Sequence, residues 1–211
     1  ANLPAVQGHN PGLLLDFYRF SSDVQVSFQA EQVALIREHS PGRPITHNLM
    51  GLFAEIDYFD LARDLDVVSW DNYPFGAMGT GRPPDPLPHD LMRGLKQQPV
   101  WVMEQAAGGG GWGVFHATPR PGQMRLWAYQ SIARGADLVN FFRWRTCRFG
   151  REQYWHGILY HHGRPQRRYA ELQTLAEECG GLAAELEGST VRHSVALLYD
   201  YESQWALEIQ P

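Results

Sequence analysis

The stretch WVMEQAAGGGG, residues 101–111, decides the fold. Together with Val100, its apolar residues Val102 and Met103 predict a buried strand, with Glu104 as the last residue before the turn into the glycines. In barrels of alternating strands and helices, the carboxyl ends of the strands form the active site, so a charged residue there indicates catalysis. We therefore expect Glu104 to be a catalytic carboxylate.

A second strand with a polar end is predicted from DVVSWDNYP, residues 66–74. The carboxyl end of this strand would form one active site together with Glu104. Tyr73 could donate a hydrogen bond that keeps a nucleophilic carboxylate ionised and oriented, or could be an amphipathic tyrosine at the edge of the sheet. Asp71 could be a catalytic partner, although a supporting hydrogen-bonding role fits a Trp-Asp-Asn-Tyr run better.

The rest of the chain alternates strands and helices. Helices are expected over residues 11–39, 58–64, 90–97, 118–134 and 168–186, and further strands over residues 44–50 and 138–144. The Gly- and Pro-rich residues 76–88 are expected to form a loop. This alternation is typical of parallel α/β architecture, and four such units are half of an eight-stranded barrel, which takes about 250 residues.

The predicted fold class is therefore α/β: the second half of a (β/α)8 barrel, about strands 5–8, over residues 1–188. A new pattern follows in residues 189–211. The apolar segment SVALLYD, residues 194–200, predicts a strand that opens a further, trimerisation-like domain, which is cut short.

Composition excludes several classes of protein. With 211 residues, 44% of them apolar, the chain can bury a sizeable core, and no apolar run approaches the roughly 20 residues of a membrane span. A net charge of −5 with scattered Lys and Arg predicts no nucleic-acid partner. Cys147 and Cys179 form neither a disulfide framework nor a metal-ligand pattern, so a reducing, cytoplasmic location is expected.

Glycosidic-bond hydrolysis suits these residues. Hydrolysis with retention needs two carboxyl groups about 5–5.5 Å apart, one attacking the anomeric carbon and one protonating the leaving oxygen. Glu104 would be the nucleophile; the alternative is a carboxylate held in a structural ion pair. The 7 Trp, 9 Tyr and 10 Phe favour a ligand with weakly polar faces, such as a sugar.

Four further residues could either contact a ligand or have a structural role. Trp112 could stack on a ligand or anchor its loop, and Phe142 could line the site or belong to the core. Glu152 and His156 could bind sugar hydroxyls or form a surface pair. The glycines 108–111 lack the Lys-Ser/Thr of a phosphate loop and predict a flexible loop. The pair at 161–162 has no third ligand at suitable spacing, so no metal site is expected.

At this point the chain resembles glycoside hydrolase family 42 β-galactosidases. The matching stretches occur in the order of the family and cover nearly the whole chain. They are LLDFYRFSSD at 14–23, THNLM at 46–50, SWDNYP at 69–74, MEQ at 103–105, RPGQMRLW at 120–127, RGAD at 134–137 and FRWR at 142–145.

The resemblance implies a retaining β-galactosidase that acts on small β-galactosides without a cofactor, as a homotrimer when full-length. It makes Glu104 the nucleophile. One departure concerns spacing, because the family places its histidine three residues after the glutamate, whereas Glu152 and His156 are four apart. The positions that match the family's galactose contacts are Tyr73, Trp112, Phe142, Glu152 and His156.

The resemblance also implies missing parts. The family's acid/base glutamate follows an asparagine on the fourth strand, and no Asn-Glu pair occurs in the 211 residues. The cysteines that bind a structural zinc in some members also precede the matched region. We therefore expect a fragment with one catalytic carboxylate, unable alone to hydrolyse lactose. The alternatives are a catalytically dead carbohydrate-binding module and a barrel hydrolase for another β-linked sugar.

Overall fold

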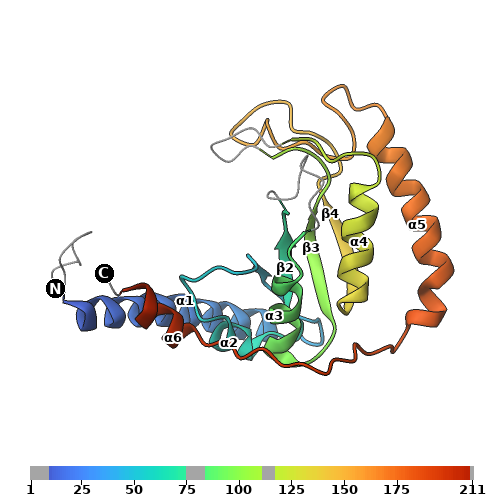
Figure 1. Cartoon of the computed structure of the whole chain (residues 1–211). Helices are drawn as coiled ribbons and strands as arrows, with labels where there is room; N and C mark the ends of the chain where they lie inside the picture. Colours follow the sequence, from blue (N-terminus) through green and yellow to red (C-terminus); the bar gives the residue numbers. More distant parts are fainter. Residues whose placement is uncertain (1–9, 75–83, 111–116, 210–211) are drawn as a thin grey trace.

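The computed structural model describes residues 10–74, 84–110 and 117–209. Within this part, four strands form one sheet in the order β1-β2-β3-β4, and every neighbouring pair is parallel (Figure 1). The strands are β1 (Asn48–Leu49), β2 (Ser69–Asn72), β3 (Val100–Ala106) and β4 (Ala136–Phe142). The carboxyl ends of all four strands therefore lie at the same end of the sheet.

Helices connect the strands, as the sequence predicted. Figure 1 shows α4 between the sheet and α5, so the helices form layers on one side of β3 and β4. The helical elements are α1 (Pro11–His39), α2 (Tyr58–Leu61), the 3-10 helix η1 (Ala62–Asp64), α3 (Leu87–Lys96), α4 (Gln123–Ala133), α5 (Arg167–Leu186) and α6 (Tyr201–Glu208). None of the helices in the described ranges is both long and apolar enough to cross a membrane.

The start of α1 follows from its capping residues. The Asn10 side chain accepts hydrogen bonds from the backbone N–H groups of Gly12 and Leu13, at 2.9 and 3.4 Å. Pro11 occupies the first helical turn, where its missing N–H costs nothing. The predicted beginning of this helix is confirmed.

The core lies between the sheet and its helices. Val100 and Val102 of β3 are 1% and 0% exposed and belong to one buried cluster with Leu91 and Met92 of α3. Apolar side chains on alternate strand residues thus cover the face toward the helices. Met103, expected in this core, is only partly buried, and β3 continues for two residues beyond Glu104.

The strand expected at residues 194–200 is wrong. These residues form no strand, and Val195, Leu197 and Leu198 are 82%, 69% and 95% exposed. A strand needs a free neighbouring edge, and this segment instead runs along the base of the molecule into α6 (Figure 1). The expected domain change after residue 188 stays a prediction.

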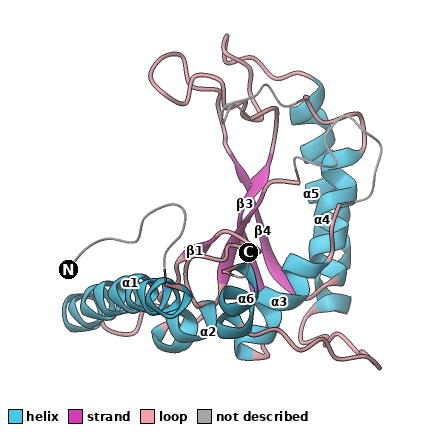
Figure 2. Ribbon diagram, turned by 60° about the vertical axis from the view of Figure 1, so that its left-hand side comes forward, coloured by secondary structure: helices cyan, strands magenta, loops and turns pink. Residues whose placement is uncertain are grey.

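Helix α6 packs against the beginning of the chain. Tyr201 and Trp205 belong to the main buried cluster, and Trp205 Nε1 donates to the backbone oxygen of Ala54 at 2.5 Å. Arg19 of α1 forms an ion pair with Glu202. Figures 1 and 2 both show α6 close to α1 and α2, so the two ends of the described chain lie near one another.

Candidate active site

Glu104 lies at the carboxyl end of the sheet, where β2 and β3 run side by side. Asp71 is the register partner of Glu104, and Asn72 is the partner of Gln105. Asn72 and Gln105 are buried, and Asn72 Nδ2 donates to Gln105 Oε1 at 2.9 Å. This amide pair fixes the two strand ends relative to one another, next to the carboxylate.

The two carboxylate oxygens of Glu104 face different neighbours. Tyr73 Oη donates to Glu104 Oε2 at 2.6 Å, and Asn48 Nδ2 of β1 makes a longer contact with Oε1 at 3.4 Å. Burial and the hydrogen bond to Glu104 raise the pKa of Tyr73, so its phenol keeps the proton and stays a donor. The predicted meeting of Tyr73 with Glu104 is present in the structure.

The ion-pair alternative for Glu104 finds no support in the described ranges. The salt bridges found there involve other carboxylates, and none includes Glu104. The residue is half-buried, so its carboxylate is neither enclosed in the core nor fully in water. This environment suits a group that must react with a ligand.

Asp71 is a second acidic group beside Glu104. Burial, followed by the negative charge of Glu104, raises its pKa to about 7. Its Oδ1 is buried and has no hydrogen-bond partner within the described ranges. At neutral pH Asp71 is therefore partly protonated.

Two aromatic rings lie against the ring of Tyr73. Trp155 lies edge-on to Tyr73 at 5.0 Å between ring centroids, and Phe142 lies 6.3 Å from each of these two rings. Phe142 is therefore at the site, as the sequence predicted. Sequence reasoning missed Trp155, which is buried, because only its position inside the 152–156 loop hinted at a role.

The glycine run is explained by close backbone contact. A Cβ on Gly108 would lie 2.4 Å from the backbone oxygen of His156, which no side chain could tolerate. His156 N donates to the Gly109 oxygen at 3.0 Å, and the described glycines 108–110 are buried. Glycine here lets the loop after β3 reach the loop that carries His156.

His156 itself is partly buried in this loop. Burial lowers its pKa, and the charges of Arg168 and His161 lower it further, which favours the neutral ring. A neutral imidazole offers both a donor and an acceptor, the combination that a sugar hydroxyl needs. The structure therefore places His156 near Gly108 with suitable chemistry, while its contact with a sugar stays a prediction.

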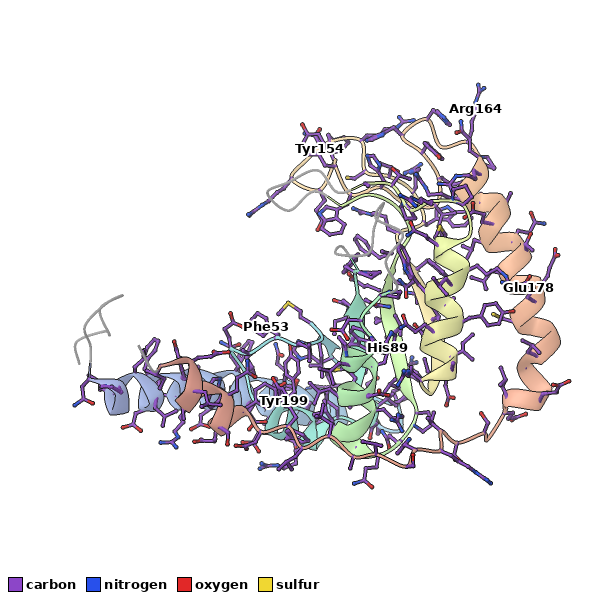
Figure 3. The ribbon with its side chains drawn as sticks, viewed as in Figure 1. Phe53, His89, Tyr154, Arg164, Glu178 and Tyr199 are labelled. Carbon is purple, nitrogen blue, oxygen red and sulfur yellow. The ribbon has the colours of Figure 1, made fainter. Side chains whose placement is uncertain are left out.

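Glu152 has a different position. It is exposed, and its carboxylate accepts from Arg143 Nη1 at 2.9 Å. Its negative charge still acts on Tyr73, which places it on the same side of the molecule. Figure 3 shows the loop that contains it, marked by Tyr154, beyond the carboxyl ends of the strands.

Two other tryptophans add little to this geometry. Trp112 lies outside the described residues. Trp144 is 61% exposed and contacts Tyr169, so it does not line the Tyr73 cluster. In the part of the chain that the structure describes, His, Cys, Asp and Glu side chains nowhere come together in a group of three that could hold a metal ion.

Comparison with known sequences gives consistent results. The chain is 40% identical to a beta-galactosidase from a Thermus species over 96% of its own length, and 41% identical to one from Haloferax lucentense over 99%. It spans 33% and 32% of these relatives, about a third of their length.

Comparison with solved structures also finds beta-galactosidases. A beta-galactosidase from Halorubrum lacusprofundi covers 100% of the chain with a TM-score of 0.89 at 40% identity, and the chain covers 33% of it. A second beta-galactosidase, from Rahnella sp. R3, has a TM-score of 0.89 at 34% identity. The match covers 99% of this chain and 32% of the Rahnella chain. The family model described as beta-galactosidase matches residues 2–182, so the chain belongs to glycoside hydrolase family 42.

Proposed function

We propose that this chain supplies the nucleophile, Glu104, of a retaining β-galactosidase. The observation that carries the proposal is the 2.6 Å hydrogen bond from Tyr73 to a half-buried carboxylate at the carboxyl end of a parallel sheet. The beta-galactosidase names of the relatives support a galactoside as substrate. In a (β/α)8 barrel, the active site lies at the carboxyl ends of the strands, which is where Glu104 lies.

The reaction would proceed in two displacements. A Glu104 oxygen forms a bond to the anomeric carbon while the bond from that carbon to the leaving oxygen breaks, and a general acid protonates the leaving oxygen. Water then attacks the same carbon, transfers its proton to the same acid/base group and releases Glu104. Tyr73 holds the other Glu104 oxygen and orients the attacking one.

The general acid would come from outside the described residues. Asp71 is in register with Glu104 on the neighbouring strand, so both lie on one side of the sugar, whereas the leaving oxygen lies on the other. We propose that β1–β4 are strands 5–8 of a (β/α)8 barrel and that earlier strands carry the acid. Without it, rate acceleration of roughly 10²–10⁴ is lost, and lactose is not hydrolysed.

The loops would hold the sugar. We propose that Phe142 packs against the galactose ring and that His156 and Glu152 bind its hydroxyls, with Trp112 stacking from the loop after β3. The complete enzyme would be a homotrimer. The ion pair of Glu152 with Arg143 would then orient the carboxylate toward the sugar.

A mechanism-based inhibitor tests the nucleophile. A 2-deoxy-2-fluoro-galactoside with a dinitrophenolate leaving group needs no general acid, so Glu104 should form a stable glycosyl ester even where lactose is not cleaved. Tryptic digestion locates the label well, because the peptide covering residues 97–125 contains Glu104 as its one acidic residue. We expect the mass of this peptide to rise by one fluorosugar.

Controls separate the alternatives. Glu104→Gln should take up no label, and the matched gluco and manno reagents should react more slowly if the site selects galactose. Galactose binding without label would indicate a carbohydrate-binding module. Equal or faster labelling by another sugar would assign the site to that sugar.

A further inference from the structure

Strand β3 contains a bulge at the position that controls Glu104. In the pairing with β4, Val102 is opposite Val139 and Gln105 is opposite Phe141. Two residues of β3 therefore lie opposite one residue of β4. The two are Met103 and Glu104, and the one is Asn140.

The pairing with β2 identifies the extra residue. There, Val102 pairs with Trp70 and Glu104 pairs with Asp71, so Met103 is left out of this register too. A residue left out of a ladder also leaves its carbonyl without a regular partner. Asn140 fills this gap, because its Nδ2 donates to the Met103 oxygen at 3.0 Å.

The bulge sets the direction of the Glu104 side chain. Residues of a strand alternate between faces, and Val102 points into the helix-covered core, so a regular strand would turn Glu104 to that same side. The extra residue shifts the alternation by one and brings Glu104 to Tyr73. A one-residue change of register reverses every side chain beyond it.

We propose that Asn140 is a positioning residue, which holds the bulge at Met103 and thereby directs Glu104 toward its phenol partner. Asn140 is exposed on the open face of the sheet, so its side chain is not needed to fill the core. Its value for the reaction rests on the proposed function, but its effect on the Tyr73–Glu104 hydrogen bond does not.

The test compares variants of one strand in the full chain. Asn140→Leu removes the hydrogen-bond donor and leaves a side chain of nearly the same size. Asp137→Leu introduces the same residue at an exposed position near the start of β4 and is the matched control. If Asn140→Leu does not fold, Asn140→Asp keeps the shape of the side chain and, once ionised, donates no hydrogen bond.

The first measurement is independent of catalysis. NMR of ring-labelled tyrosine shows whether Tyr73 ionises in alkaline buffer, where it should stay protonated in the unmodified chain because burial and Glu104 raise its pKa. In Asn140→Leu the pKa of Tyr73 should fall toward its ordinary value, because Glu104 no longer accepts its hydrogen bond, and in Asp137→Leu it should stay raised. A loss of stability alone would not produce this selective change.

The second measurement is the labelling rate of Glu104. Displacement of the carboxylate by about 1 Å costs about 10²-fold, so the maximal labelling rate should fall by this order while inhibitor binding changes less. Tyr73 titration and labelling like those of the unmodified chain would overturn the inference. Absence of label in the unmodified chain, with the Tyr73 shift intact, would reject the proposed function and keep the role of Asn140.

Discussion

The two faces of the sheet differ in what their side chains contact. Toward the helices, Val100 and Val102 are 1% and 0% exposed and pack in the main core. On the other face, Asn140 is exposed, and Glu104 is half-buried with its carboxylate against Tyr73. One face thus provides stability and the other offers reactive groups, so substitutions on the two should affect different measurements.

The largest expected effect is on the open face. Glu104→Gln keeps the size of the side chain and removes the attacking oxygen, so labelling by the fluorosugar should fall on the order of 10³-fold or more. The midpoint of thermal unfolding should change little. A variant that unfolds early, or that labels as fast as the unmodified chain, would contradict the separation of the two faces.

The opposite result is expected on the helix-covered face. Met92 of α3 is 0% exposed, and Met92→Ala should lower the free energy of unfolding by about 2–5 kcal/mol, because it removes buried apolar atoms and leaves a cavity. Urea unfolding measures this loss. Leu126→Ala, at a position 52% exposed, is the control and should change stability by less than about 0.5 kcal/mol. Equal losses in both would show that α3 does not anchor the core.

Asp71 tests the cost of placing charge on the open face. Its pKa is raised to about 7 by burial and by Glu104, so folding favours the protonated form. Below pH 3.8, the ordinary pKa of the group, Asp71 is protonated in the folded and unfolded states alike and does not lower stability. As pH rises from there to about 7, the folded state loses stability, by a few kcal/mol at most because solvent screens this partly exposed carboxyl group.

Asp71→Asn should therefore stabilise the fold more at pH 8 than at pH 5. Urea unfolding at the two pH values measures the difference, and Asp137→Asn accounts for the general effect of losing one negative charge. A gain that is larger at pH 5 would mean that Asp71 is ionised and favourably held.

Much of the fold could be predicted from the sequence. The alternation of apolar strands with helices predicted the parallel sheet, and the helix expected to begin at residue 11 does begin there, as α1. The ends of the strands then predicted that Tyr73 would meet Glu104, because parallel strands bring their carboxyl ends to one edge. These inferences depend on local periodicity and topology, which the sequence displays directly.

Other features depend on three-dimensional contacts. The bulge at Met103 is invisible in a strand pattern, since it is defined by the residues of β2 and β4 that lie opposite. Trp155 reaches Tyr73 through a loop whose path is set by the glycines after β3. The apolar residues 194–200 have strand character, but they run along the base of the molecule and pair with none of β1–β4, so their local preference has no effect.

Removing the Tyr73 hydroxyl group gives the smallest of these effects and the sharpest test of the open face. Tyr73→Phe keeps the ring against Trp155 and Phe142 and deletes only the donor to Glu104. A hydrogen bond to a charged group contributes about 1.5–3 kcal/mol, so labelling should slow roughly 10- to 100-fold.

The matched control is Tyr129→Phe, which deletes a phenol that donates to Glu178 of α5, away from the site. If both variants label at the rate of the unmodified chain, Tyr73 does not orient the nucleophile. If Tyr73→Phe slows labelling as much as Glu104→Gln does, the phenol takes part in the bond-forming step itself, because loss of orientation alone leaves an attacking oxygen in place.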